Sequence, residues 1–257
     1  MVVVHCPQFD MRLLVNKKLW LLAVLVLVPA SIVALRSRET PKPLADLPPV
    51  IVWAWERPEK LDFIDTHQIG VAFLAKTVRL EGDRVVSKPR LQRLELAPGT
   101  KLIAVVRIEA TQPTLSPSQL AQTTAEVIEL AKLSGISVVQ IDFDGTVSER
   151  DFYRALLNEV KPRVPSLSIT ALASWCAGDN WLTDLPIDEA VPMLFRMGLD
   201  QKHFQSVPRF EPAICAAAAG VSTDESITTP AVDRLYMFNP KPWTRDSLNS
   251  ALEAYRK

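Results

Sequence analysis

Short apolar runs recur along the chain from Val50 onward, and most of them are continuous instead of alternating with polar residues. Continuous hydrophobicity is typical of strands that are covered on both faces, as in a parallel sheet. We predict eight such strands, at Val50–Trp55, Gly70–Ala75, Leu102–Ile108, Val138–Phe143, Leu167–Ala173, Ala190–Leu194, Ala213–Gly220 and Leu235–Asn239.

Several intervals between these runs have apolar residues at helical spacing. Ser116–Ser134 ends before Gly135, a common helix stop, and Ser148–Val164 begins with Ser148 as its expected cap. Thr244–Arg256 is the third long helix. Two shorter intervals, Pro58–Ile64 and His203–Val207, have room only for short helices.

Eight strands that alternate with helical intervals predict an α/β fold, a small (β/α)₈ TIM-like barrel over residues 50–257. This segment is short for the fold, which usually runs to about 250 residues, so the second, sixth and seventh intervals are expected to hold loops. In the second, the turn Glu81-Gly82-Asp83 predicts a surface hairpin. An open doubly wound sheet is the alternative.

The amino-terminal part of the chain has a different composition. Residues 1–36 contain Arg12, Lys17 and Lys18 followed by the uncharged apolar stretch Leu19–Leu35, and residues 37–49 form a proline-rich linker. A basic flank before an apolar run is typical of a membrane-targeting segment. One interpretation is an uncleaved helix that anchors the protein in the inner membrane by a single pass. The other is a signal peptide cleaved after Ala30. Both place the barrel in the periplasm.

Charge and cysteine content exclude some functions and leave one question open. The net charge is zero, so no basic excess is available to bind nucleic acid. No C-x-x-C pair occurs, which argues against a structural zinc site. Outside the cytoplasm Cys176 and Cys215 could form a disulfide, and the alternative is two buried thiols.

Two aspartates lie at the end of the fourth predicted strand, in the stretch Val138–Arg150 (VVQIDFDGTVSER). Asp142 and Asp144 are two residues apart, so on an extended strand their carboxyl groups point to the same face. Two like charges that lie close together raise the pKa of one of them, which suits a general acid beside an ionised partner. We expect this pair to mark a site at the carboxyl end of the sheet.

Charged and indole side chains follow most of the other predicted strands, whose ends meet at one rim of a barrel. Tryptophan faces stack on sugar rings, and carboxylates bind hydroxyl groups or cleave the glycosidic bond. The pattern therefore predicts a site for a glycan or another small polar ligand. The catalytic candidates are Asp142, Asp144, Glu56, Glu109 and Glu225, and the substrate-binding candidates are Trp53, Trp55, Arg107, Trp175, Asp179, Arg196, Asp224 and Asn239.

Our leading hypothesis is a glycoside-hydrolase-like enzyme that needs no metal and no cofactor. Asp142 or Asp144 is then the acid, one of the three glutamates the second carboxylate, and the tryptophans the stacking surface. Structural roles are open as well, with Trp53 packed inside the barrel and Arg107 and Asp142 in a buried ion pair. Two further function classes are a non-catalytic carbohydrate-binding barrel and a structural envelope protein.

The string DFDGTV at Asp142–Val147 resembles the first motif of haloacid-dehalogenase-like phosphatases, D-x-D-G-T-[LV] after an apolar strand. The resemblance implies Asp142 as nucleophile, Asp144 as acid/base and magnesium as cofactor. Thr170 or Ser174 would stand for the second motif, and Asp179 with Asp184 for the fourth. The third motif has no counterpart, because no lysine lies between Thr170 and Asp179.

A longer set of strings, including VWAWERPEKLDFID, GVAFLAKTVRL, VVQIDFDGTVSERDFYRALL, ITALASWCAGDNWL and FNPKPW, resembles the bacterial family known as domain of unknown function 3142. The resemblance implies a barrel distantly similar to glycoside hydrolases. The fourth strand is also similar to the chitinase-like motif D-G-x-D-x-D-x-E, whose second and third acids match Asp142 and Asp144. Thr146 stands where that motif has its catalytic glutamate, and Glu149 is the nearest glutamate along the chain.

Overall fold

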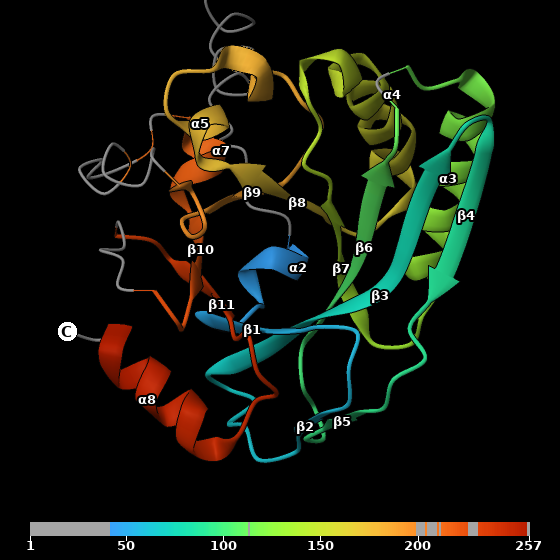
Figure 1. The fold of residues 1–257 in the computed structure, drawn as a ribbon. Helices are drawn as coiled ribbons and strands as arrows, with labels where there is room; N and C mark the ends of the chain where they lie inside the picture. The colour runs from blue at the N-terminus through green and yellow to red at the C-terminus, as the bar shows by residue number, and fades with distance from the viewer. Residues whose placement is uncertain are drawn as a thin grey trace, which may run out of the picture. The chain divides into compact units, whose positions relative to one another are not determined.

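The computed structural model describes residues 42–112, 114–198, 204, 210, 212–225 and 231–255. Eight parallel strands follow one another around a ring in chain order (Figure 1). Because β1 pairs with both β3 and β11, the sheet is closed. The predicted barrel is therefore confirmed, and the open doubly wound sheet is wrong. The barrel strands are β1 (Val50–Ala54), β3 (Ile69–Glu81), β6 (Leu102–Ala110), β7 (Ile136–Asp142), β8 (Leu167–Leu172), β9 (Glu189–Met193), β10 (Ala218–Ser222) and β11 (Arg234–Phe238).

The eight predicted strands correspond to these eight, with two larger boundary errors. The predicted strand Gly70–Ala75 is too short, because β3 continues to Glu81. The run Ala213–Gly220 was predicted as one strand, but its first half is the short helix α7 (Ala213–Ala216). β10 begins only at Ala218. Alanine favours a helix, which suits the first half of this alanine-rich run. The run becomes a strand at Ala218, where it joins the barrel sheet.

The predicted hairpin is confirmed, since β3 continues to Glu81 and pairs with the antiparallel strand β4 (Arg84–Pro89). Gly82 has a φ of 56°, a left-handed conformation that suits glycine in a tight turn. The predicted helix Pro58–Ile64 is wrong. This segment contains β2 (Glu59–Leu61), which pairs with β5 (Leu94–Leu96) in a small separate sheet. The Glu59 carboxylate accepts the backbone N–H of Trp243, which holds the extended segment against the barrel.

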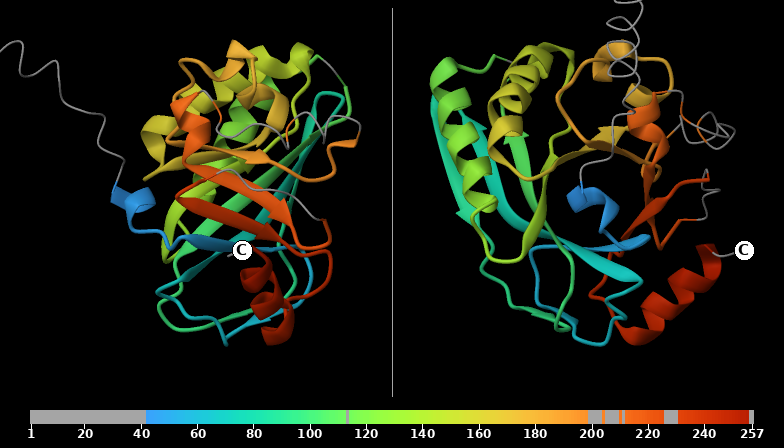
Figure 2. Two further views of the ribbon diagram at one scale, coloured as in Figure 1. Left: turned by 90° about the vertical axis from the view of Figure 1, so that its left-hand side faces the viewer. Right: turned by 180° about the vertical axis from the view of Figure 1, so that it is seen from behind.

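The three predicted long helices are present as α3 (Pro117–Leu130), α4 (Arg150–Val160) and α8 (Arg245–Tyr255). Figures 1 and 2 show α3 and α4 on one flank of the barrel and α8 on the opposite flank. The described residues also contain three short 3₁₀ turns: η1 (Val147–Glu149), η2 (Lys161–Arg163) and η3 (Asn180–Leu182). The predicted Ser148 cap is wrong, because the helical segment already begins after Thr146. His203–Val207 lies outside the described residues except for Phe204.

Apolar side chains fill the inside of the barrel. The helix α2 (Lys42–Ala45) closes its amino-terminal end, where Leu44 and Leu47 pack against Ile51 and Val138. Arg234 donates to the carbonyl of Leu44 at 2.6 Å, which ties the closure to β11. The amino-terminal end of the barrel is thus covered by α2.

One buried polar network lies above this closure. The Glu189 carboxylate is paired with Arg234 and accepts hydrogen bonds from Tyr236 at 2.7 Å and Ser168 at 2.9 Å. Ser168 in turn accepts a hydrogen bond from Gln140 at 2.9 Å. A buried charge that is paired and hydrogen-bonded in this way stabilises one arrangement of the strands over others.

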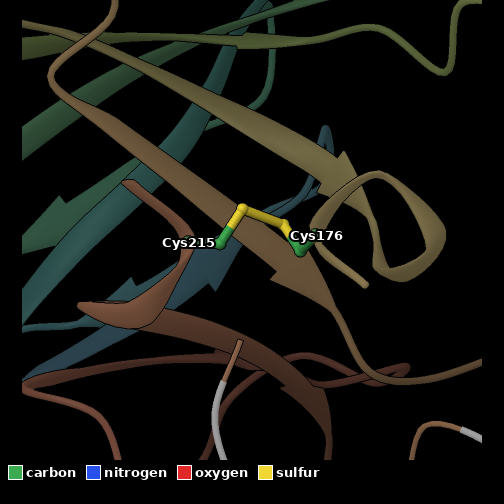
Figure 3. The surroundings of a disulfide bond; sticks show 2 residues. All are labelled: Cys176 and Cys215. Carbon is green, nitrogen blue, oxygen red and sulfur yellow. A yellow bond between two sulfur atoms is a disulfide. The ribbon is translucent and has the colours of Figure 1, made fainter. Parts of the chain in front are cut away.

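Cys176 and Cys215 form a disulfide that links α5 (Ala173–Cys176) to α7 (Figure 3). Both residues are fully buried in the apolar layer between the barrel and its outer helices. The alternative of two buried thiols is therefore wrong. Within the described part of the chain, no helix is long and apolar enough to cross a membrane, and Leu19–Leu35 lies outside it.

Candidate functional site

A pocket of about 530 Å³ opens at the carboxyl ends of the barrel strands. Its wall is divided by chemistry. β6 and β7 contribute Arg107, Asp142 and Asp144, whereas β1, β9 and β11 or the residues just after them contribute Trp55, Phe195 and Phe238. Because β6 and β7 lie across the ring from β10 and β11, Arg107 and Asp142 lie across the pocket from Phe238. Arg196, which follows Phe195 after β9, is a charged residue on the aromatic side.

The aromatic side is a continuous group of rings. The ring centroids of Phe238 lie 4.9 Å from Phe195 and 6.1 Å from Trp55. Trp53 lies one layer deeper, with its centroid 4.5 Å from Phe238. Rings at these distances and tilts support one another, so Trp55 and Phe238 have little freedom to move.

Asp142 is the central group of the charged side. It ends β7, points into the barrel and keeps only 9% of its surface exposed. Its Oδ1 accepts a hydrogen bond from the Thr170 hydroxyl on β8 at 2.9 Å. Its Oδ2 lies 3.6 Å from Nη1 of Arg107, which is within ion-pair range but beyond a hydrogen bond. One oxygen is therefore held, and the other has only a distant cation.

Burial raises the pKa of Asp142 from 3.8 to about 6, and the nearby charge of Asp144 adds to this effect. The positive charge of Arg107 and the Thr170 hydrogen bond oppose it by favouring the ionised form. The result is a carboxyl group that changes its protonation near neutral pH. This is the range in which a carboxyl group is useful as a general acid.

A smaller hollow of about 230 Å³ lies beside the pocket and shares Arg107, Asp142 and Asp144 with it. Glu109 and Glu149 also line this hollow. Glu109 is bound to Arg107 at 3.1 Å and Arg79 at 3.5 Å. Its charge is therefore balanced by two guanidinium groups.

Glu149, the nearest glutamate to the motif position along the chain, lies near the site but was not among the predicted site residues. Its carboxylate accepts hydrogen bonds from the Thr146 backbone N–H at 2.6 Å and the Thr146 hydroxyl at 2.9 Å. This is the capping box of η1, and the pattern Thr146-Val147-Ser148-Glu149 is the signal that could have found it. The position of the missing motif glutamate is thus occupied by a threonine that binds another glutamate.

The structure brings together six of the predicted site residues. Five of them line the pocket and one lines the adjoining hollow. They are Trp55, Arg107, Asp142, Asp144, Arg196 and Glu109.

Three other predicted acids hold loops at the rim. Glu56 accepts the backbone N–H groups of Leu91 and Gln92 at 2.9 and 3.3 Å. Glu225 accepts the backbone N–H of Arg196 at 3.1 Å, and Asp224 binds the guanidinium of the same residue at 3.0 Å. The pKa of Asp224 is lowered because the Ser222 hydroxyl donates to it and Arg196 lies nearby. None of these three carboxylates lines the pocket.

Arg196 is held in an unusual backbone conformation by these contacts. Its φ of 54° is left-handed, which is rare for a residue with a long side chain. Such a conformation persists only where surrounding contacts enforce it, and Asp224 and Glu225 provide them here. The Arg196 side chain is thereby kept at the pocket, with most of its surface exposed.

Four predicted ligand-binding residues lie elsewhere. Trp53 is only 1% exposed and packs inside the barrel, which is the structural alternative that the sequence left open. Trp175 is 3% exposed and packs in the outer layer against Trp181. Asp179 binds Arg150 and caps η3, and Asn239 accepts a hydrogen bond from Thr223 at 2.7 Å.

Tyr153 lies near the two aspartates and was not predicted from the sequence. It is fully buried on α4, with its ring 5.2 Å from that of Phe143. Burial and the charges of Asp142 and Asp144 raise its pKa well above the usual value. Its hydroxyl has no hydrogen-bond partner among the described residues. No feature of the sequence separates this tyrosine from an ordinary core residue.

The residues present do not fit the magnesium site that a haloacid-dehalogenase-like phosphatase would need. Within residues 42–112, 114–198 and the other described positions, no three carboxylate, histidine or cysteine side chains converge on one point. The cation beside Asp142 is the guanidinium of Arg107. The motif DFDGTV therefore occurs here at a barrel strand whose acids are arranged around an arginine.

Comparison with known proteins gives one match. Residues 98–191 match the family model described as Domain of unknown function (DUF3142). Neither the curated proteins nor the solved structures contain a match to the chain. The matched stretch runs from β6 to β9 and includes Arg107, Asp142, Asp144 and Thr170. Over this stretch the chain is similar to DUF3142, as its sequence motifs predicted.

Proposed function

We propose that the pocket at the barrel mouth binds a carbohydrate and that the protein is a glycoside-hydrolase-like enzyme with Asp142 as its proton donor. One observation carries the proposal: a buried carboxyl group with a pKa of about 6 lies across a pocket from a group of aromatic rings. A sugar ring has an apolar face and polar edges, so it matches a site with one aromatic and one charged side.

The chemistry assigns a separate task to each side chain. Protonated Asp142 donates its proton to the oxygen of the glycosidic bond as that bond breaks, and Arg107 stabilises the carboxylate that remains. Asp144 makes no hydrogen bond or ion pair with the described residues, which leaves it available as the second carboxylate. It would stabilise the positive charge that develops on the sugar or activate a water molecule. Trp55 and Phe238 would hold the sugar ring.

A carbohydrate-binding protein without catalysis is the second candidate, and a specific observation favours it. Thr146 stands in place of the glutamate of the chitinase-like motif, and Glu149 is engaged in the capping box. Glu109 is likewise held by two arginines. Among the described carboxylates that line the pocket and the hollow, only Asp144 then has no hydrogen-bond or ion-pair partner and could act together with Asp142.

The test is a glycan panel in which binding and cleavage are measured for the purified full chain. The proposed enzyme binds at least one oligosaccharide and releases reducing ends from it. Asp142→Asn binds but does not cleave, while Asp62→Asn, an exposed carboxylate on the far segment after β2, behaves as wild type. Binding without cleavage by wild type would favour the second candidate. No binding at all would reject both.

The proposal includes a location outside the cytoplasm. The Cys176–Cys215 disulfide supports it, because disulfides persist mainly in oxidising compartments. The basic residues before the apolar stretch Leu19–Leu35 support export or anchoring in the inner membrane. The test is thiol alkylation of the protein in cell fractions. A protein in the periplasmic or membrane fraction with Cys176 and Cys215 protected until reduction supports the location, and free thiols in the cytosolic fraction contradict it.

A further inference from the structure

Inside the barrel, β7 and β8 carry two polar pairs, one above the other. The lower pair is Gln140 and Ser168, which are register partners joined by a 2.9 Å hydrogen bond. The upper pair is Asp142 and Thr170, two residues further along each strand and also joined at 2.9 Å. All four side chains are buried. The position of the Asp142 carboxyl group is thus set from the neighbouring strand.

The two oxygens of Asp142 have different surroundings. Oδ1 receives the Thr170 hydroxyl, whereas Oδ2 faces Nη1 of Arg107 at 3.6 Å without a hydrogen bond. Thr170 is β-branched and lies in a strand at 2% exposure, so its hydroxyl has little freedom to turn away. Asp142 and Arg107 both line the pocket, and Oδ2 is the carboxyl oxygen without a hydrogen-bond donor, so Oδ2 is the oxygen that a ligand can engage.

We propose that Thr170 is a positioning residue for Asp142: its hydroxyl holds Oδ1 and leaves Oδ2 as the oxygen that exchanges a proton with a bound ligand. This inference rests on the proposed function of the pocket and deepens it. In the protonated acid, Oδ1 is the carbonyl oxygen that accepts from Thr170, and Oδ2 carries the proton. When the proton leaves, the hydrogen bond from Thr170 and the charge of Arg107 stabilise the carboxylate.

The test is a pH titration of the Asp142 carboxyl group in the purified full chain, followed by infrared difference spectroscopy with Asp142→Asn as the blank. Thr170→Val removes the hydroxyl at nearly constant shape. We expect the midpoint to rise by about one pH unit, since a hydrogen bond to the charged form is lost. The carbonyl band of the protonated acid should move to higher wavenumber, because Oδ1 no longer accepts a hydrogen bond.

Two variants distinguish positioning from a general structural effect. Thr170→Ser keeps the hydroxyl and should restore both the midpoint and the band. Ser168→Ala removes a hydroxyl one layer lower on the same strand and should change neither. If Thr170→Val does not fold, Thr170→Ala replaces it, because it removes the hydroxyl without a new methyl group at its place. The same rise in the midpoint and the same shift of the band are expected.

An unchanged midpoint and band in the folded Thr170 variant would overturn the proposal. An equal shift in Ser168→Ala would also overturn it, because loosening of the barrel would then be the cause. The titration needs no ligand. Failure of the wild-type chain to bind any glycan would therefore reject the proposed function separately from the role of Thr170 in holding Oδ1.

Discussion

The two ends of the barrel interior each contain a buried acid, and the two acids are treated differently. At the closed end, Glu189 is 2% exposed and both of its oxygens are occupied, by Arg234, Tyr236 and Ser168. At the open end, Asp142 is 9% exposed and has one hydrogen bond and one arginine at 3.6 Å. At the closed end both carboxylate oxygens accept hydrogen bonds, whereas at the mouth Oδ2 of Asp142 has no hydrogen-bond donor.

This difference distinguishes a carboxylate that stabilises the barrel from one that is available for chemistry. A carboxylate whose two oxygens both accept hydrogen bonds holds strands together and has no unpartnered oxygen to offer a ligand. A carboxyl group that is buried beside a like charge and has one oxygen free is costly to ionise, and folding alone gives no reason to retain it. We therefore assign a structural role to Glu189 and a functional one to Asp142.

The largest expected effect is on the closed end. Glu189→Gln leaves the buried guanidinium of Arg234 without its counter-charge, which typically costs about 3–5 kcal/mol of unfolding free energy. Urea unfolding of the variant and the wild type measures this loss. A loss below about 1 kcal/mol would show that the closed end tolerates an unpaired charge and would contradict the structural role of Glu189.

At the mouth, replacement of the acid should have the opposite sign. The pKa of Asp142 is about 6 in the folded protein and 3.8 for an unperturbed aspartate, so the folded protein binds more protons than the unfolded chain between these values. Stability from this group therefore falls as pH rises from about 4 to about 6, by at most about 3 kcal/mol. Asp142→Asn has no such loss.

Urea unfolding at two pH values checks this sign. We expect Asp142→Asn to be more stable than wild type at pH 7.5, and the difference to shrink towards pH 4. Asp62→Asn provides the control for removing a surface carboxylate. A variant that is less stable than wild type at pH 7.5 would assign Asp142 to the structural class of Glu189.

The smallest expected effect concerns the aromatic side of the mouth. Trp55→Ala removes one ring of the pocket wall and should weaken glycan binding about tenfold or more, since loss of an aromatic contact costs on the order of 1–2 kcal/mol. Trp55→Phe keeps a ring and should lose less. Titration calorimetry with the glycan found in the panel measures both. Equal affinity of Trp55→Ala and wild type would remove Trp55 from the binding surface.

The order of the strands and the place of the acids follow from the sequence, because continuous apolar runs and the two-residue spacing of Asp142 and Asp144 have direct structural meaning. The depth of a side chain in the barrel does not. Trp53 in β1 and Trp55 just after it are only two residues apart, yet only Trp55 lines the pocket. Depth depends on the stagger between strands, which no single run of residues encodes.

Contacts between residues far apart in the sequence were harder to decide, and for Cys176 and Cys215 the sequence left both a disulfide and two buried thiols open. Cys176 and Cys215 are 39 residues apart, and their pairing depends on how α5 and α7 pack. The ion pair between Glu189 and Arg234 likewise joins residues that lie far apart in the sequence. By contrast, the Glu149 capping box is a local pattern that a closer examination of the sequence could have identified.

The titration midpoint of the Asp142 carboxyl group in the wild-type full chain tests the central claim most directly. Carbon-13 resonances of labelled aspartate, assigned with Asp142→Asn, give this value without any ligand. The account predicts a midpoint of about 6, far above that of exposed aspartates. A midpoint near 4 would contradict it, because Asp142 would then be an ordinary ionised carboxylate paired with Arg107.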